Sequence, residues 1–170
     1  MIKIRKVTTK GEIDAVAALA HDVWTRHYVP IIGRKQTEYM LANIQSAPAI
    51  ARQIAEGYLY YLVLEDGRRA GYFAILPDRK KRSALLSKIY VRHELRGRGL
   101  GKAIMDFVEK YCLKKKIKIL WLTVNRNNKG SIAFYLRAGF KKSGKIVKDI
   151  GDGFIMDDYK MVKTIGRTVK

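Results

Sequence analysis

The sequence predicts an α/β protein in which a mixed sheet of about seven strands is flanked by helices. Strand-like and helix-like segments alternate along the chain. A glycine-rich run, Arg96 to Gly101, joins the strand-like segment Ser83 to Val91 to a helix-like one, Lys102 to Lys115. Another strand-like segment follows, and a strand, helix, strand unit places its strands parallel in one sheet. Hairpin-like segments elsewhere add antiparallel neighbours.

Length and composition favour one domain over residues 1–170. Of the 170 residues, 48% are hydrophobic and 29% are charged, which is ordinary for a soluble globular protein. The longest apolar run, Tyr58 to Leu64, is far shorter than the roughly 18 residues of a membrane span. Met1 to Lys6 reads as a strand and not as a signal peptide, so a cytoplasmic protein is expected.

The first half of the chain predicts a strand, helices and a hairpin. Thr8 and Thr9 offer an N-cap, with Glu12 in the first turn, for a helix that runs to about His27 and breaks at Pro30. An Asp66-Gly67 pair between two apolar segments is typical of a hairpin turn. The other predicted segments are strand 2–7, helices 36–44 and 49–56 on either side of Pro48, and strands 58–65 and 69–76.

The second half predicts four more strands and two helices. Residues 118–124 are β-branched and aromatic, which favours a buried strand. A short helix over 128–137 ends before Gly139, and Gly151-Asp152-Gly153 turns the last hairpin. The predicted segments are strands 83–91, 118–124, 140–148 and 153–163, and helices 102–115 and 128–137.

The junction at residues 96–101 is typical of a phosphate-binding site. Gly97, Gly99 and Gly101 let backbone N–H groups approach a ligand, and the start of a helix adds a partial positive charge. Cationic side chains are supplied by Arg96, Arg98 and Lys102.

Two common nucleotide motifs are excluded by spacing. A P-loop has Ser or Thr after its Gly-Lys pair, whereas Ala103 follows Gly101-Lys102. A dinucleotide fingerprint has two residues between its second and third glycines, whereas Leu100 alone separates Gly99 from Gly101.

The pattern Arg/Gln-x-x-Gly-x-Gly/Ala is met by Arg96, Gly99 and Gly101, and its surroundings strengthen it. Lys88 to Val91 precede it, and residues 119–125, Asn128, 131–135 and 138–140 follow in order. Over roughly residues 85–145 the chain resembles the GCN5-related N-acetyltransferase (GNAT) family. The resemblance implies a sheet that splays between its central parallel strands. It also implies acetyl-CoA as cofactor and direct attack by a primary amine in a ternary complex.

The resemblance also implies which residues hold the coenzyme. Backbone groups of the strand before the loop would bind the acetyl carbonyl and pantetheine, and the loop would wrap the pyrophosphate. Asn128 would bind the pantetheine amide. The coenzyme-binding residues implied in this way are Ile89, Tyr90, Val91, Arg96, Gly97, Arg98, Gly99, Leu100, Gly101, Lys102, Asn128 and Ser131.

Acyl transfer requires an acid for the leaving thiolate. Tyr135 matches the family position whose hydroxyl faces the sulfur. A phenol of pKa about 10 can protonate a thiolate of pKa about 8.5 without being ionised itself. The alternative is that Phe134 and Tyr135 are both core aromatics of a short helix.

The base for the amine is harder to assign. Many relatives carry a glutamate on the strand before the glycine loop, but Leu85 to Lys88 contains no acid. Ser87 is the candidate that positions a water to relay the proton. His27 and His93 are alternatives, but the expected places of His93 in the loop and of His27 at a helix end favour structural roles for both.

Acidic residues gather near the C-terminus and suggest an acceptor site. Four of the fifteen acidic residues lie within ten positions, at Asp149, Asp152, Asp157 and Asp158. We expect Asp157 or Asp158 to attract the ammonium of a small amine. The alternative is that the Asp-Gly pairs only form a turn and the other two balance nearby lysines.

Two further features bear on the acceptor. Trp24, His27 and Tyr28 either line its pocket or pack over it. Residues 150–161 resemble the ending of a subgroup that includes bacterial and archaeal polyamine acetyltransferases. A net charge of +20 repels a polycation at long range and argues against spermidine unless the acidic hairpin dominates locally.

The single cysteine and the high net charge limit which other kinds of site and partner the protein can have. Cys112, the only cysteine, falls on the apolar face of its helix and is expected in the core, with no disulfide and no metal site. The charge of +20 exceeds the roughly four negative charges of coenzyme A. The basic runs are Arg79 to Arg82, Lys114 to Lys116 with Lys118, and Lys141-Lys142.

These runs fall on predicted turns and helix ends and form no single stripe, so a solvated surface is the simplest interpretation. The alternatives are a basic nucleic-acid-associated module on the same scaffold, and an acetyltransferase of protein N-termini or lysines. Either a monomer or a homodimer agrees with the sequence, and no membrane partner is expected.

Overall fold

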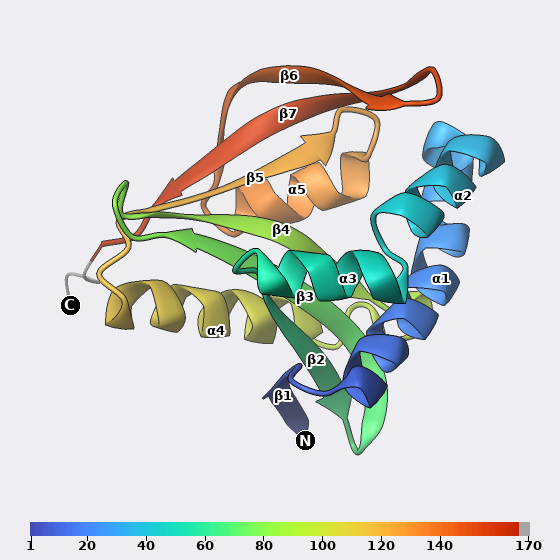
Figure 1. The fold of residues 1–170 in the computed structure, drawn as a ribbon. Coiled ribbons are helices and arrows are strands. Elements are labelled where there is room, and N and C mark those ends of the chain that lie inside the picture. The colour runs from blue at the N-terminus through green and yellow to red at the C-terminus, as the bar shows by residue number, and fades with distance from the viewer. Residues whose placement is uncertain (167–170) are drawn as a thin grey trace. The chain divides into compact units, whose positions relative to one another are not determined.

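The computed structural model describes residues 1–166, which form seven strands, five α-helices and one 3-10 helix (Figure 1). The strands hydrogen-bond in the order β1-β2-β3-β4-β5-β7-β6. This mixed, open sheet confirms the predicted fold class. The strands are β1 (Ile2–Lys6), β2 (Leu59–Glu65), β3 (Arg68–Asp78), β4 (Ser83–Val91), β5 (Ile119–Asn125), β6 (Lys141–Gly151) and β7 (Phe154–Thr164). The helices are α1 (Lys10–Ile32), α2 (Arg34–Asn43), α3 (Ala47–Ala55), η1 (His93–Leu95), α4 (Leu100–Lys114) and α5 (Lys129–Arg137).

The described chain divides into two compact units. The first contains Met1–Leu76 and Lys88–Ile104, and the second contains Pro77–Ser87 and the chain from Met105 onward. The prediction of a single domain over residues 1–170 stays a prediction. No helix within residues 1–166 is both long enough and apolar enough to cross a membrane.

Helix α1 begins as the sequence predicts and ends later. The Thr9 hydroxyl accepts from the backbone N–H of Glu12, whose carboxylate accepts from the N–H of Thr8 and Thr9, so a capping box closes the first turn. The predicted break at Pro30 is wrong, because α1 continues through Pro30 to Ile32. Pro30 lies in the last turn, where its missing N–H removes only one hydrogen bond near the helix end.

In the first unit, strands β1, β2 and β3 form an antiparallel meander. The β2–β3 turn is the predicted Asp66-Gly67 pair, with φ of +48° and +79°, the left-handed backbone that such a two-residue turn requires. The buried face of α1 includes Leu19, Val23 and Trp24, and Trp24 hydrogen-bonds to the buried Tyr72 of β3. Helices α1 and α2 lie against each other (Figure 1).

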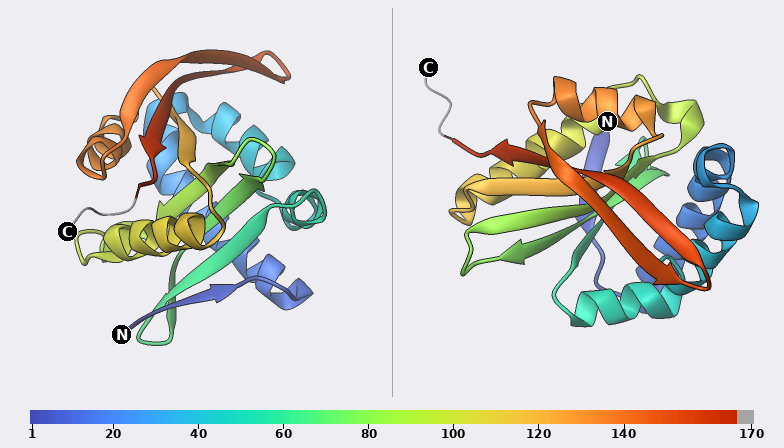
Figure 2. Two further views of the ribbon diagram at one scale, coloured as in Figure 1. Left: turned by 90° about the vertical axis from the view of Figure 1, so that its left-hand side faces the viewer. Right: turned by 90° about the horizontal axis from the view of Figure 1, so that it is seen from above.

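In the second unit, β4 and β5 pair in parallel, as predicted. The pairing is short: Ser83, Ala84 and Leu85 lie opposite Ile119, Leu120 and Trp121. Strand β7 runs antiparallel to β5 and continues into the long, twisted β6–β7 hairpin (Figure 2). The predicted place of Cys112 in the core is confirmed, and burial raises the pKa of its thiol to about 11, so that it stays protonated near neutral pH.

Candidate active site

The glycine loop has the backbone conformation that its sequence predicts. Strand β4 ends at Val91, η1 follows, and α4 begins at Leu100. Gly97 and Gly99 have φ of +78° and +81°, in the left-handed region that favours glycine. Nothing lies within 4 Å of where a Cβ would stand at either residue, so these glycines serve the backbone path and leave space around it. The first N–H groups of α4 have no partner within the helix, so they can bind a ligand at this loop.

The two arginines of the loop contact residues of other elements. The Arg96 Nε donates to the Val91 carbonyl at 3.3 Å, and its Nη2 lies 3.4 Å from Nδ1 of His27 on α1. Arg98 forms an ion pair of 3.5 Å with Glu65 at the end of β2. Burial lowers the pKa of Arg96, although a guanidinium stays charged at any neutral pH.

These groups fit the diphosphate of coenzyme A. The loop offers backbone N–H donors, and Arg96, Arg98 and Lys102 supply cations on either side of the two left-handed glycines. Anions bind at such helix starts because unpaired N–H groups and the helix dipole both favour negative charge. Leu100 is fully buried, so only its backbone can contribute.

Three predicted acceptor residues lie together on α1, and two of them, Trp24 and Tyr28, contact β4. The Trp24 ring lies 4.5 Å from Tyr28 and 5.2 Å from Tyr90 of β4, measured between ring centroids. The hydroxyls of Tyr28 and Tyr90 are 3.3 Å apart, and the ring of His27 packs edge-on against Tyr28 at 4.8 Å. The Trp24 Nε1 donates to Tyr72 at 2.9 Å, so Trp24 is also part of the core.

His27 and His93, the alternative candidates for the base, have different surroundings. Arg96 donates to Nδ1 of His27 only when that nitrogen carries no proton. His93 is exposed and begins η1, where it lines a cavity of about 390 Å³ together with His21 and Arg92. The prediction that His27 lies at a helix end is wrong, because α1 extends five residues beyond it.

In the second unit, Asn128 serves as the N-cap of α5. Its Oδ1 accepts from the backbone N–H of Ser131 at 3.4 Å, and its side chain is buried. Tyr135 lies farther along α5 with 7% of its surface exposed, and its ring packs edge-on against Phe134 and Phe140 at 5.4 and 5.7 Å. Ser87 is half-buried on β4. The sequence analysis missed the capping role of Asn128, although Asn is among the residues preferred at an N-cap.

The two candidate carboxylates of β7 differ in their surroundings. Asp157 forms an ion pair of 2.9 Å with Arg126, so its partner is an arginine and not a lysine. Asp158 lies opposite Asn125 and has 5% of its surface exposed. Burial raises the pKa of Asp158 to about 6, against the opposing effect of a hydrogen bond from Thr123. Because Asn128 N–H bonds to the Asn125 carbonyl, a predicted coenzyme residue and both acidic candidates lie at the same end of β5.

Comparison with known proteins agrees with this geometry. Residues 18–140, well over half of the chain, match the acetyltransferase (GNAT) family. The chain belongs to this family. The predicted coenzyme, acetyl-CoA, is the one that GNAT proteins use, and the predicted enzyme class is that of the family.

Individual relatives and structures add detail. The chain is 31% identical over 111 residues to an uncharacterized N-acetyltransferase of Methanocaldococcus jannaschii, a match that covers 62% of this chain and 45% of that protein. The chain thus spans about half the length of this relative. It is 25% identical over 162 residues to a spermidine N(1)-acetyltransferase of Thermoplasma acidophilum, covering 92% of this chain and 96% of that one.

Among solved structures, the chain is similar to the PaiA N-acetyltransferase of Thermoplasma acidophilum in complex with coenzyme A. The TM-score is 0.81 at 23% sequence identity, with 96% of this chain and 99% of that chain covered. At this identity the likeness supports the GNAT fold.

This GNAT protein also contains a buried lysine that the sequence reasoning missed. Lys88 is the last of three buried residues at alternate positions of β4, after Ala84 and Leu86, and it has 7% of its surface exposed. Its Nζ donates to Oε1 of Gln53 on α3 at 2.9 Å. The signal was present in the sequence, because the two-residue period of a strand assigns Lys88 to the same face as two apolar residues.

Proposed function

We propose that this GNAT protein transfers the acetyl group of acetyl-CoA to the amine of a small molecule. The observation that carries the proposal is the left-handed glycine loop at the start of α4, with cations on both sides, in a chain of this family. Acetyl-CoA supplies an activated thioester, and the protein's residues bind, orient and move protons around it. Direct attack by the amine needs no residue to carry the acetyl group, in agreement with the buried, protonated thiol of Cys112.

The coenzyme contacts in this proposal come mostly from backbone. N–H groups of residues 97–101 bind the diphosphate, while Arg96, Arg98 and Lys102 offset its charge. Backbone groups of Ile89 to Val91 hold the acetyl carbonyl and pantetheine, and Asn128 with Ser131 contributes at the pantetheine amide.

Two side chains of the second unit take catalytic roles in this proposal. The Tyr135 hydroxyl gives its proton to the leaving thiolate, which a phenol of higher pKa does without being ionised beforehand. Ser87 orients a water beside the amine. The close aromatic packing of Tyr135 supports a fixed ring orientation, which proton transfer to one atom requires.

The proposed acceptor is a primary amine. Trp24, His27 and Tyr28 provide an aromatic wall, and Asp158 provides a carboxylate whose charge attracts an ammonium; Asp157, already paired with Arg126, contributes less. The spermidine acetyltransferase of Thermoplasma acidophilum, to which the chain is similar over almost its whole length, supports an amine of this kind.

Calorimetry with acetyl-CoA tests the coenzyme part of the proposal. We expect binding with a Kd below about 50 µM, well within the typical range for enzyme substrates. No heat at that concentration would contradict it.

A panel of polyamines, amino acids, aminoglycosides and basic peptides, read out as coenzyme A release, then identifies the acceptor. Coenzyme binding without release on any amine would contradict the transfer reaction.

Tyr135→Phe tests the acid. Because only the hydroxyl is lost, kcat should fall by about 10²-fold or more while the acetyl-CoA Kd stays within about twofold. Tyr111→Phe, which removes a half-buried phenol from α4, is the matched control and should leave both values unchanged. Equal kcat in the Tyr135→Phe variant and the wild type would remove Tyr135 from the mechanism.

A further inference from the structure

Two basic runs that are far apart in the sequence meet at one end of the second unit. The turn between β3 and β4 contains Arg79 to Arg82, and the second run begins at Lys114, the last residue of α4, and continues through the turn to Lys118. The Lys118 N–H donates to the Arg82 carbonyl at 2.8 Å, and Nε of Arg82 donates to the Lys116 carbonyl at 3.2 Å. The two turns are therefore tied together by hydrogen bonds.

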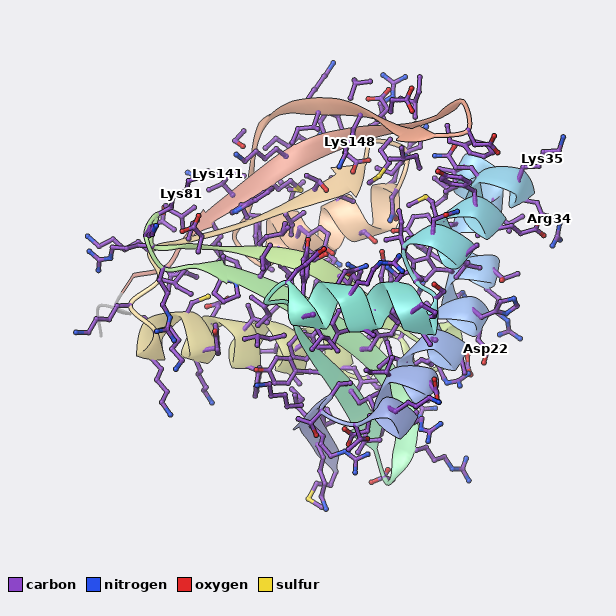
Figure 3. The ribbon with its side chains drawn as sticks, in the orientation of Figure 1. Asp22, Arg34, Lys35, Lys81, Lys141 and Lys148 are labelled. Atoms are coloured by element: carbon purple, nitrogen blue, oxygen red, sulfur yellow. The ribbon has the colours of Figure 1, made fainter. Side chains whose placement is uncertain are left out.

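The third basic run lies at the same end. Ser83, Ile119 and Thr164 form one row across β4, β5 and β7, and Val162, two residues from Thr164, pairs with Lys141 of β6. Three strand spacings of about 4.8 Å separate β4 from β6, so the cations cover a surface about 15 Å wide. Figure 3 shows Lys81 and Lys141 at this end and Lys148 farther along the hairpin. The sequence-based interpretation of scattered basic runs is thus wrong for the second unit.

We call this surface the basic end, and all of its ten cationic residues are exposed. The basic end consists of Arg79, Lys80, Lys81, Arg82, Lys114, Lys115, Lys116, Lys118, Lys141 and Lys142. Among residues 1–166, Lys81 of the basic end forms an ion pair with Asp78 at 3.9 Å. The acidic residues Asp149 and Asp152 lie at the opposite end of the β6–β7 hairpin, where Gly151 pairs with Phe154. These two carboxylates therefore lie away from the basic end.

Two residues of the basic end hold a strained backbone. Arg82 and Lys116 have φ of +50° and +58°, a conformation that costs a side-chain-bearing residue about 1 kcal/mol or more. Glycine or asparagine would adopt it at lower cost. Strain of this kind accumulates where function requires a side chain at a given place. Here both strained residues take part in the hydrogen bonds that join the two turns.

We propose that the basic end binds the phosphate backbone of a nucleic acid. Lysines make up most of the surface, and their flexible ammonium groups suit regularly spaced phosphates without reading sequence. The width of the surface suits several consecutive nucleotides. The glycine loop proposed to bind the diphosphate of coenzyme A contributes none of these ten residues.

Fluorescence anisotropy with a labelled single-stranded RNA of about 20 nucleotides tests the proposal. Binding should weaken as salt rises from about 50 to 200 mM, with a slope that counts the phosphates contacted. The test variant replaces Lys80, Lys81, Lys115 and Lys142 with serine. The control variant replaces Lys3, Lys6, Lys10 and Lys35, exposed lysines of the first unit, with serine and has the same net charge.

We expect the test variant to bind RNA at least about tenfold more weakly, with a shallower salt slope, and the control variant to change by less than about threefold. Equal weakening by both variants, or no binding by the wild type, would overturn the proposal. Duplex DNA and polyglutamate are the comparison ligands. Tighter binding of polyglutamate than of either nucleic acid would assign the surface to an acidic protein and also overturn it. Acetyl-CoA binding, measured on the same variants, should stay unchanged.

A second inference concerns Lys88 and rests on the proposed acetyl transfer. The amide of Gln53 is held in one orientation, because its Nε2 donates to the Ile44 carbonyl at 2.9 Å. Its Oε1 then accepts from the Tyr60 hydroxyl at 2.6 Å and from Lys88 Nζ at 2.9 Å. The position of Nζ is thereby tied to α3 and β2.

The surroundings of Lys88 are aromatic. Its Nζ lies 5.2 Å from the ring centre of Tyr58 and 5.6 Å from that of Tyr60. Both phenols are titratable and face it from β2 and the preceding turn, and burial, with a smaller effect of Glu56, raises the pKa of Tyr58. Burial lowers the pKa of Lys88 to about 7, so that a large fraction of its side chain is a neutral amine near neutral pH.

The geometry points to Lys88 as the general base of the reaction. Lys88 directly precedes Ile89 to Val91, the proposed acetyl-binding backbone, on the strand segment that contains no acid. Its neutral amine, in place of Ser87 on the opposite face of β4, accepts a proton from the acceptor ammonium, directly or through one water. The N–H bond of the substrate breaks, and Lys88 becomes an ammonium that hydrogen-bonds to Gln53. The released amine attacks the thioester, and Lys88 later returns its proton to solvent.

The pH dependence of turnover tests this inference, because a structural lysine would not set it. Wild-type kcat/KM should fall below about pH 7, where Lys88 is charged. Gln53→Glu adds a carboxylate beside Nζ, which favours the ammonium and should move this acid limb upward by about one pH unit or more. Lys88→Met should lower kcat by about 10²-fold with an unchanged acetyl-CoA Kd, whereas Lys110→Met, an exposed lysine of α4, changes neither.

Turnover in Lys88→Met with the wild-type pH profile would overturn the assignment and leave the acetyltransferase proposal intact. Absence of turnover in the wild type would contradict both. A titration of Lys88 by NMR, on protein labelled at the lysine ε-carbon, needs no activity and covers the case of a variant that fails to fold. A midpoint near about pH 10, the ordinary lysine value, would also sink the inference.

Discussion

At the scale of single residues, two buried ionisable groups have pKa values displaced toward neutrality, and both through burial. Lys88 in the first unit is shifted down to about 7, and Asp158 in the second is shifted up to about 6. Burial disfavours the charged form of each, so it lowers the pKa of an amine and raises that of a carboxyl group. Groups with such values cluster at functional sites, which supports the roles proposed for both residues.

Lys88 should destabilise the folded protein at and below neutral pH. Its folded pKa is about 7 and its ordinary value is 10.5, so the unfolded chain binds more protons between these values and stability rises with pH across them. Lys88→Met removes the penalty, and its free energy of unfolding at pH 7 should exceed that of the wild type by a few kcal/mol. The difference should vanish toward about pH 10.5. Urea unfolding at several pH values measures it, and a difference independent of pH would contradict the shift.

Asp158 should give the free energy of unfolding the opposite pH dependence. Its folded pKa is raised from 3.8 to about 6, so its favourable contribution is complete below 3.8 and is lost as pH rises through about 6. Asp158→Asn should therefore match the wild type near pH 4 and be more stable by about 2 kcal/mol at pH 7. Thermal unfolding at several pH values measures the difference, and an equal effect of the substitution at pH 4 and pH 7 would contradict the shift.

At the scale of secondary-structure elements, glycine positions separate two physical roles. Gly97 and Gly99 adopt left-handed backbone in open space, whereas Gly71 on β3 is required because another strand comes close. A Cβ at Gly71 would lie 2.3 Å from the carbonyl oxygen of Tyr90, well inside any allowed contact. Position 71 thus fixes the path of β4 at the point where the proposed acetyl-binding backbone begins.

Gly71→Ala should destabilise the first unit by about 2 kcal/mol or more, because the clash is with backbone and has no flexible side chain to absorb it. It should also weaken acetyl-CoA binding by displacing Tyr90. Gly11→Ala is the control: Gly11 lies in α1 with nothing within 4 Å of its Cβ position, and alanine there should stabilise by about 0.5–1 kcal/mol. Chemical unfolding and calorimetry measure both effects, and a neutral Gly71→Ala would disprove the close approach.

At the scale of the whole molecule, a net charge of +20 dominates the long-range electrostatics. Self-repulsion of this size destabilises a compact state, and added salt screens it over a Debye length of about 10 Å at 0.1 M. The same field draws coenzyme A and other polyanions toward the protein at low salt. It also repels polyamines, so an amine acceptor depends on local carboxylates such as Asp158.

The melting temperature should therefore rise with salt. Between about 10 and 300 mM sodium chloride we expect an increase of a few degrees, because screening relieves like-charge repulsion more than it weakens exposed ion pairs. The serine variant of Lys80, Lys81, Lys115 and Lys142 should show a smaller increase than the wild type. Differential scanning fluorimetry measures it, and a falling melting temperature would mean that surface ion pairs outweigh the repulsion.

The sequence by itself determined the elements, the glycine loop and the family pattern. These follow from local rules: a two-residue period for strands, left-handed turns at Asp66-Gly67, a cap at Thr9, and glycines where the backbone turns around a phosphate. These rules did not predict the end of α1, because the free-energy cost of Pro30 in a helix depends on how far it lies from the helix terminus.

Only the tertiary structure decided what surrounds each charged side chain. The desolvation of Lys88 by Tyr58, Tyr60 and Gln53, the pairing of Asp157 with Arg126, and the meeting of three basic runs all join residues distant in the sequence. Burial and electrostatic fields depend on such neighbours in space. Spacing along the chain therefore could not assign the protonation of these residues, their partners or the surface they share.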